Sequence, residues 1–233
     1  MKRIEKVSLV FCIMIFLICG KYLLNYWIDS YDNRQNYNQV EELAFPEMDD
    51  NNDETNESDQ KSEDLQEDTD ISYPVVQGED NEFYLHHDFY KKNAICGAIF
   101  LDYRNDVNRM QEHLILYGHQ MKDGSMFKQL NGYKEKSFYE GHREITLFLG
   151  TKKYRYEVAA VYVTNLTKSG DYYNYVHKET RKQQMEYLQK MAAYQPYETG
   201  ITVREEDELL SLSTCEYSSE NGRLIVLARR TVE

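Results

Sequence analysis

The sequence predicts a mainly β domain over residues 71–233, which follows an apolar segment and then an acidic one. Short runs of apolar and β-branched residues recur in this part of the chain, and Gly, Asn and Asp separate many of them. Tyr154, Tyr156 and Val158 alternate with charged residues, which is typical of a half-buried strand. The runs that we expect to form strands are 94–101, 113–117, 144–149, 154–164, 201–203, 208–214 and 223–228.

The N-terminal region predicts a membrane anchor. Residues 1–6 carry three basic side chains, and residues 7–28 carry a single charge, Lys21. A helix of that length spans roughly 33 Å, about the thickness of a hydrocarbon core. We therefore expect residues 1–6 to form a cytoplasmic tail and 7–28 a single-pass signal anchor, with the rest of the chain outside the cell. A cleaved signal peptide and a lipoprotein signal are the alternatives, but the residues before Cys19 are not small and no small-x-small site follows closely.

Residues 29–70 predict a polar, acidic and mostly disordered spacer, in which 29–45 are compatible with a short polar helix. Residues 41–70 carry 14 Asp and Glu against one Lys, so this stretch alone accounts for the net charge of −13 of the whole chain. A calcium site is the alternative for the acidic stretch, although the acids lack the spacing of a calcium-binding loop. The absence of a basic excess argues against a nucleic-acid partner.

One helix is expected within the β domain, at residues 177–194. Met185, Leu188 and Ala192 recur at helical spacing on one face, and Pro196 follows as a terminator. An amphipathic helix of this kind packs its apolar face on a sheet.

The last two predicted strands bring a cysteine and an arginine together. In residues 210–215 the side chains alternate, so that Cys215 shares a face with Ser213. If the next strand is its antiparallel neighbour, Arg223 begins that strand at the end of the sheet where Cys215 finishes the previous one. A cation beside a thiol favours the nucleophilic thiolate, and a guanidinium can also hold an oxyanion. The alternative is that Cys215 is a small buried apolar residue.

His119 is the candidate general acid or base. It follows a predicted strand and Gly118, at a strand end where site residues often lie. Of the four cysteines, Cys96 and Cys215 are the two outside the apolar N-terminal run. A disulfide between them, or a buried Cys96 with a reactive Cys215, fits the count equally well.

Several blocks of residues 71–233 resemble class B sortases. These blocks are LSLSTC, RLIVLAR and LYGHQMKDGSMF, together with YPVVQG, FYLHHDF and GAIFLDYRND. The resemblance implies a closed eight-stranded β-barrel with N-terminal helices and one long helix, here 177–194, inserted before the last two strands. It implies His119, Cys215 and Arg223 as catalytic residues, with no cofactor and no metal. Positions that match the family's peptide groove are Ser213, Glu216, Thr167 and Tyr172.

The implied function is that of a membrane-anchored cysteine transpeptidase. Such an enzyme cleaves the C-terminal sorting motif of a secreted protein through a thioacyl intermediate and joins the protein to a peptidoglycan amine. Two alternatives remain open on the sequence. One is a non-catalytic extracellular binding or assembly domain on the same barrel, and the other is a hydrolytic cysteine protease that shares the first half-reaction.

Overall fold

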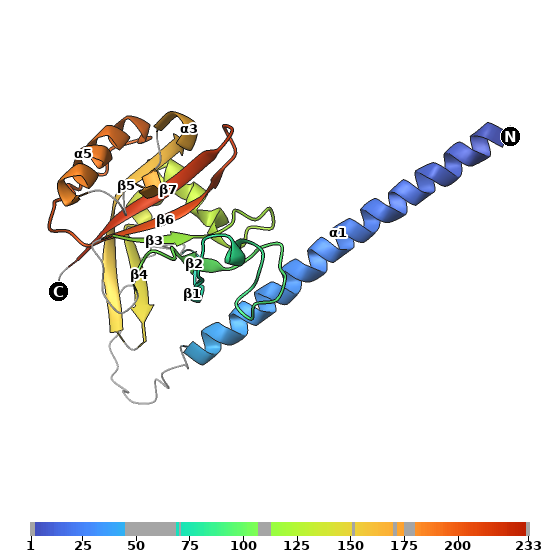
Figure 1. Ribbon diagram of the computed structural model, residues 1–233, viewed down its shortest axis with the longest axis horizontal. Coiled ribbons are helices and arrows are strands. Elements are labelled where there is room, and N and C mark those ends of the chain that lie inside the picture. Colours follow the sequence, from blue (N-terminus) through green and yellow to red (C-terminus); the bar gives the residue numbers. More distant parts are fainter. Residues whose placement is uncertain are drawn as a thin grey trace, which may run out of the picture.

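The computed structural model describes residues 3–44, 69, 71–106, 113–150, 152–169, 172–174 and 180–231. These residues form a curled sheet with a long N-terminal helix beside it (Figure 1). The sheet has seven strands in the described residues, in the order β1-β2-β3-β6-β7-β5-β4. The strands are β1 (Val75–Gln77), β2 (Ile99–Leu101), β3 (His113–Tyr117), β4 (Glu144–Leu149), β5 (Lys152–Asn165), β6 (Leu209–Glu216) and β7 (Gly222–Arg230).

Strand pairing explains how distant parts of the chain meet. The pairs β1–β2 and β3–β6 are parallel, whereas β2–β3, β4–β5, β5–β7 and β6–β7 are antiparallel. The parallel β3–β6 pair joins residues about a hundred positions apart, and it places the end of β3 beside the end of β6. The catalytic candidates lie at these two ends.

The expected mainly β architecture is confirmed, but two details of the prediction are wrong. Residues 201–203 do not form a strand, because their backbone groups bond to side chains instead: the Ile201 N–H donates to Thr199 Oγ1 at 3.2 Å, and Arg229 donates to the Thr202 carbonyl at 3.3 Å. In addition, the expected run 94–101 contributes only β2, at its C-terminal end.

The expected closed eight-stranded barrel is a further correction. The described strands form an open, curled sheet whose edge strands, β1 and β4, are not paired with each other. A cavity of about 530 Å³ lies between these edges, and its lining includes Ile71, Tyr73, Ile145 and Leu147. The two edges are therefore separated by this cavity, and the backbone pairing that would close a barrel does not form between β1 and β4.

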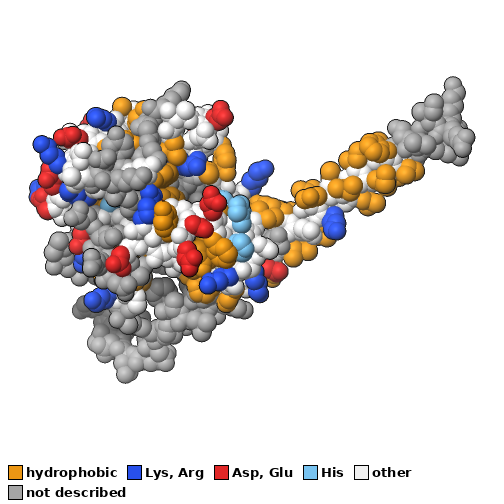
Figure 2. Space-filling view, in the orientation of Figure 1, with side chains coloured by type: hydrophobic (Ala, Val, Ile, Leu, Met, Phe, Trp, Pro, Cys, Tyr) orange, Lys and Arg blue, Asp and Glu red, His pale blue; other side chains and the backbone are white. Residues whose placement is uncertain are grey.

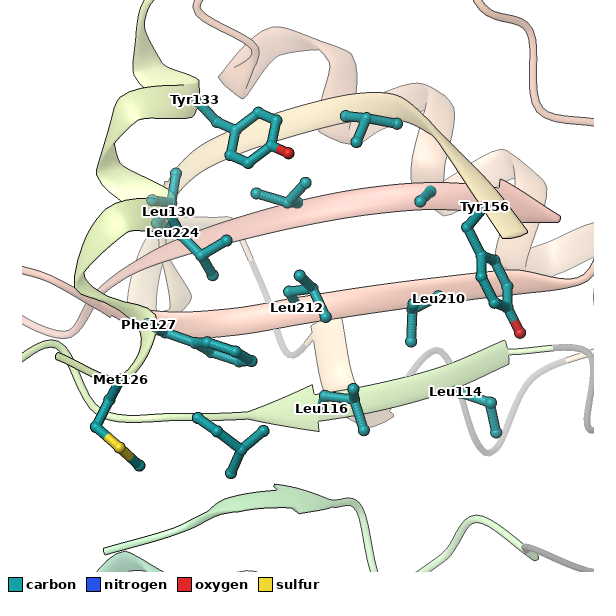
Figure 3. Packing of buried hydrophobic residues seen from close by; sticks show 14 of the residues in the cluster. Leu114, Leu116, Met126, Phe127, Leu130, Tyr133, Tyr156, Leu210, Leu212 and Leu224 are labelled. Atoms are coloured by element: carbon teal, nitrogen blue, oxygen red, sulfur yellow. The ribbon is translucent and has the colours of Figure 1, made fainter. Parts of the chain in front are cut away.

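The inner face of the sheet carries the main apolar core. Alternate residues of β3, β6 and β7 point inward and pack against η2 (Phe127–Lys134), as Figure 3 shows. The residues at this interface include Leu114, Leu116, Leu210, Leu212, Leu224, Phe127, Leu130 and Tyr133. Because both faces of the central strands are covered, a one-residue slip of β6 would bury Ser211 and Ser213 in this apolar core.

The outer face is covered by α5 (Arg181–Met191), which continues as η3 (Ala192–Tyr194). Met185, Leu188 and Met191 are buried against the outer side chains of the sheet, as the predicted amphipathic pattern requires. The helix begins at Arg181, after a capping box at Thr180. This start is four residues later than the predicted start at residue 177. His177 itself lies outside the described residues, and Ala192 is exposed because the helix tightens there.

The remaining short helices are η1 (Phe83–Leu85), α2 (Lys136–Gly141) and α3 (Leu166–Ser169). Of these, η1 contributes Leu85 to the cleft at the candidate site, which lies where β3 and β6 end and β7 begins.

The N-terminal region of the chain forms one continuous helix, α1 (Arg3–Ala44). It joins the expected apolar span and the expected helix at 29–45 without a break, so one helix is described where the family resemblance implied several. Within the described residues, the helical stretch Val10–Tyr37 contains an 18-residue window with a mean hydropathy of 1.7, which is long and apolar enough to cross a membrane. Apolar side chains cover the exposed surface of this helix (Figure 2). The acidic stretch that follows lies outside the described residues.

The C-terminal half of α1 packs against the β domain. Tyr37 is buried, its hydroxyl donates to the carbonyl of Gly97 at 3.3 Å, and its ring meets Tyr73 edge to face at 5.2 Å. Ser30 donates to the carboxylate of Asp123. The helix is therefore attached to the domain before the acidic stretch begins.

An ion pair joins the end of η2 to the C-terminal end of β6. Glu216 is 4% exposed, and Lys134 Nζ donates to its Oε1 at 2.5 Å. The Ser218 N–H donates to Oε2 at 2.9 Å. Burial raises the pKa of Glu216, but the hydrogen bonds from Lys134 and Ser218 outweigh burial and hold this pKa below its ordinary value.

We expect Glu216→Gln to reduce the free energy of unfolding at pH 7, because Gln cannot keep the charge-assisted hydrogen bonds. The pKa of Glu216 is lower in the folded chain than in the unfolded one. Its contribution is therefore complete above the unfolded pKa of about 4.3 and is lost as the pH falls through the folded value. Chemical denaturation at pH 7 and at pH 3 should show a large difference from wild type only at pH 7.

Glu206→Gln is the matched control, since Glu206 forms an exposed pair with Arg204 at 3.9 Å. Exposed pairs contribute little, so this variant should unfold like the wild type at either pH. Equal behaviour of the two variants at pH 7 would contradict the role assigned to Glu216.

Candidate active site

Cys215 and Arg223 are direct cross-strand partners. In the antiparallel β6–β7 pair, Cys215 lies opposite Arg223 and Glu216 lies opposite Gly222. Directly opposite residues have Cβ atoms about 4.5–5.5 Å apart and share one face of the sheet. Both side chains are half-buried. The pairing predicted from the alternating pattern is thus confirmed, and it brings a guanidinium to the thiol.

His119 reaches the same place from the other side of β6. In the parallel β3–β6 pair Tyr117 lies opposite Ser213, and the Gly118 N–H donates to the Ser213 carbonyl at 3.1 Å. The same offset, carried two residues beyond Tyr117, places His119 level with Cys215. The strand that carries Cys215 therefore lies between the strand that leads to His119 and the strand that begins with Arg223.

The imidazole of His119 has a defined orientation. Its Nε2 lies 2.8 Å from the carbonyl oxygen of Leu85, which follows Tyr84 in η1. A carbonyl only accepts hydrogen bonds, so Nε2 carries the proton in this contact and Nδ1 remains to exchange a proton with a reacting group. An imidazole held in this way can act as a general acid or base.

Gly118 allows this approach because a side chain would not fit there. A Cβ at this position would lie 2.4 Å from Cδ1 of Ile99 and 2.7 Å from Cδ2 of Phe127. The absence of a side chain thus lets the core pack directly against the backbone that leads into His119, as the sequence suggested.

Gln120 connects the histidine loop to the nucleophile strand. With its amide oriented to satisfy its neighbours, its nitrogen donates to the Cys215 carbonyl at 2.6 Å, and its oxygen lies 3.2 Å from Lys128 Nζ. The sequence reasoning missed this residue, although it directly follows His119 in the matching block.

The candidate residues line one cleft of about 460 Å³. Its other walls come from the η1 region, from the turn after β2 and from the residues that precede α5. The lining residues are Asn81, Leu85, Phe100, Tyr103, Arg104, Tyr117, Gly118, His119, Tyr173, Asn174, Ser213, Thr214, Cys215 and Arg223. Of the four substrate-contact residues suggested by resemblance, the cleft includes Ser213.

The cleft contains Tyr173 rather than the predicted Tyr172. Tyr172 is fully buried among the outer core residues, and its hydroxyl bonds to Ser211 Oγ at 2.7 Å. The Tyr173 hydroxyl bonds to Ser213 Oγ at 2.7 Å. Burial raises the pKa of Tyr173, whereas the Ser213 hydroxyl and the nearby Arg223 guanidinium lower it. The doublet Tyr172-Tyr173 was the available signal, but the pattern did not decide which ring faces the cleft.

Two further groove predictions are not met by the structure. Glu216 points to the inner face, because residues at 210, 212, 214 and 216 alternate with the outward-facing Cys215. Thr167 is exposed in α3, where its hydroxyl meets Asn221 Nδ2 at 3.5 Å, and it does not line the cleft.

The disulfide alternative is excluded, since Cys96 and Cys215 do not form a disulfide. Cys96 is 2% exposed and belongs to the inner core, where it packs among apolar residues. Cys215 therefore stands in the cleft as a thiol.

The β domain of this chain matches known proteins. The sortase domain family matches residues 67–231. Sortase B of Listeria monocytogenes is 38% identical over 163 residues, which cover 68% of this chain and 64% of that protein, so the match spans somewhat less than two thirds of the Listeria protein.

Solved structures give the same result. Sortase B of Bacillus anthracis, in complex with AAEK1, superposes with a TM-score of 0.69 at 29% identity, over 89% of this chain and 100% of that one. A Staphylococcus aureus sortase B–substrate complex has a TM-score of 0.61 at 32% identity, over 68% of this chain and 73% of that one. With a matching family model, a related sortase B sequence and the shared fold, this chain belongs to the sortase family.

Proposed function

We propose that this protein is a membrane-anchored transpeptidase of the class B kind, which attaches secreted proteins to peptidoglycan. The observation that carries the proposal is the arrangement around β6: Cys215 opposite Arg223, with His119 level with it from β3, in one cleft. A binding domain without turnover would not need a thiol, an imidazole and a guanidinium at one strand end. The solved complex of the Staphylococcus aureus relative with its substrate supports substrate binding by this fold.

The first half-reaction cleaves the sorting motif, for which the family resemblance implies a pentapeptide of the Asn-Pro-x-Thr-x type. The Cys215 thiolate attacks the Thr carbonyl carbon, and the carbonyl oxygen becomes an oxyanion. Arg223 donates one Nη1 hydrogen to the Gly222 carbonyl at 2.9 Å and also hydrogen-bonds Tyr173, and the five-donor guanidinium has further N–H groups that can hold the oxyanion. The His119 imidazolium protonates the leaving amine, the C–N bond breaks and a thioester to Cys215 remains.

The second half-reaction transfers the acyl group. An amine of a peptidoglycan precursor enters the cleft and attacks the thioester, while neutral His119 accepts its proton. The C–S bond breaks, Cys215 leaves as a thiolate and a new amide joins the secreted protein to the acceptor. The enzyme returns to its starting form without any external reductant or cofactor.

The anchor is the remaining part of the proposal. The apolar part of α1 supports a single membrane span with a cytoplasmic N-terminus, because three basic residues precede it. The acceptor precursor is itself bound to the membrane, so an enzyme held at the outer surface meets it at raised effective concentration.

Cys215→Ala should abolish cleavage of a sorting peptide, because no other group can form the thioester. Mass spectrometry of the protein after incubation with the peptide should show the acyl adduct in the wild type and none in this variant. Cys96→Ser is the matched control, and it should retain the adduct because Cys96 is buried in the core away from the cleft. Adduct formation by Cys215→Ala would contradict the nucleophile assignment.

Arg223→Lys should lower kcat by about a hundredfold, because a point charge cannot replace the planar donor fork at the oxyanion. Arg229→Lys is the control: Arg229 pairs with Glu157 at 3.2 Å, opposite the far end of β6, and its replacement should leave kcat near the wild-type value. Wild-type turnover by Arg223→Lys would reduce Arg223 to a structural role.

Product analysis with an added amine distinguishes transfer from hydrolysis. With a peptidoglycan-type amine present, the amide-linked product should dominate over the free acid. A free acid product at every amine concentration would instead identify a cysteine protease.

A further inference from the structure

A second polar cluster lies at the cleft, on the side formed by the turn after β2. Its centre is Asp102, which is 0% exposed. The carboxylate accepts hydrogen bonds from Arg104 Nε at 2.8 Å and Nη2 at 2.6 Å, and from the Arg104 backbone N–H at 3.0 Å. It also accepts from the Tyr117 hydroxyl at 2.8 Å and from Asn81 Nδ2 at 3.0 Å. An ionised carboxylate has about four lone-pair sites, so these donors saturate it.

The three side chains that donate to Asp102 all line the cleft, whereas Asp102 itself lies behind them. Asn81, Arg104 and Tyr117 come from three different segments of the chain. Tyr117 lies at the end of β3, two residues before His119. The buried charge of Asp102 therefore sets the orientation of these three side chains, Asn81, Arg104 and Tyr117. We call them the cleft wall, which begins beside the catalytic histidine.

The wall presents specific unused hydrogen-bonding groups to the cleft. The Asn81 oxygen accepts from the Tyr103 N–H at 3.0 Å, so its amide is occupied. The Tyr117 hydroxyl uses its proton on Asp102, which leaves its oxygen as an acceptor. Arg104 Nη1 reaches Asn174 only at 3.4 Å, which leaves guanidinium N–H groups as donors. An acceptor beside a donor matches the N–H and C=O of a peptide group.

The surroundings of Tyr117 keep its ring in place and its hydroxyl protonated, so that the hydroxyl donates to Asp102. Its ring packs against Phe100 with centroids 5.2 Å apart and against Tyr173 at 5.4 Å. Burial, together with the negative charge of Asp102, raises the pKa of Tyr117 far above its ordinary value. The phenol therefore stays protonated and continues to donate to Asp102.

We propose that Asp102 is a positioning residue for the acyl-donor peptide. It holds Tyr117 and Arg104 so that their free oxygen and N–H groups bind one peptide group of the donor, which sets where the scissile carbonyl falls relative to Cys215. This inference rests on the proposed function and adds a residue that acts through the cleft wall. Burying a paired carboxylate carries a desolvation penalty that apolar side chains in the same place would not. What the buried Asp102 carboxylate provides is a fixed orientation of the side chains that donate to it.

Asp102→Asn tests the proposal, because the amide nitrogen would face donors that the carboxylate now binds. In the full chain in detergent, the Kd of a sorting peptide in a Cys215→Ala background and the KM for cleavage with Cys215 present should each rise about tenfold. The kcat at saturating peptide should change far less, since Asp102 touches neither the thiol nor the imidazole. Tyr117→Phe should produce a similar rise in Kd.

The double variant Asp102→Asn/Tyr117→Phe shows whether the two residues act as one unit. Its rise in Kd should not exceed that of the weaker-binding single variant, because either change breaks the same contact. Asp88→Asn is the matched control, since Asp88 is also buried and accepts the Lys92 N–H at 2.8 Å away from the cleft. It should lower the melting temperature and leave the Kd unchanged.

Each outcome decides the matter. An unchanged Kd in Asp102→Asn, or additive effects in the double variant, overturns the positioning role while turnover by the wild type still supports the enzyme. If Asp102→Asn does not fold, Tyr117→Phe keeps the Asp102–Arg104 pair and tests the wall alone, and an unchanged Kd again overturns the role. A wild-type chain that binds the peptide but never forms the thioester overturns the proposed function instead.

Discussion

The position of β6 between β3 and β7 is the constraint on which the site depends. Its parallel pairing with β3 brings His119 beside Cys215, and its antiparallel pairing with β7 brings Arg223. A shift of either pairing by one residue would turn one of these side chains to the opposite face of the sheet. Leu210 and Leu212 resist such a shift from inside, and the helix-covered outer face resists it from outside. The candidate catalytic side chains are thus aligned by the packing of leucines on β6.

Local patterns predicted the part of this arrangement that depends on neighbouring strands. Alternation in β6 placed Cys215 on one face, and the short polar turn predicted its pairing with Arg223. The same alternation also puts Glu216 inward with Leu212, so the groove role suggested by resemblance conflicted with a signal already in the sequence. The β3–β6 contact joins segments far apart in the chain, and no local pattern predicts which strands become parallel neighbours.

Other parts could not be predicted because they depend on side-chain contacts between distant segments. The choice between Tyr172 and Tyr173 depends on which tyrosine bonds to Ser211 and which to Ser213, two residues apart on one face of β6. The edge between β1 and β4 stays open around a cavity, which no local pattern indicates, whereas the family resemblance implied closure. Asp102 follows a strand in a turn-like run, where an aspartate is ordinary and its burial cannot be read from neighbours.

The attachment of α1 to the β domain changes what the acidic stretch can do. Ala44 ends a helix that Tyr37 has already bound to Gly97, and the chain re-enters the described domain at Thr69. The acidic stretch therefore connects two parts of the chain that already contact each other. It is not the link that sets the distance between α1 and the β domain. The height of the cleft above the apolar span follows from helical rise, about 1.5 Å for each residue. Insertions or deletions in the acidic stretch can accumulate without altering that height, whereas a single residue added near Tyr37 would rotate the whole body by about 100° around the helix axis.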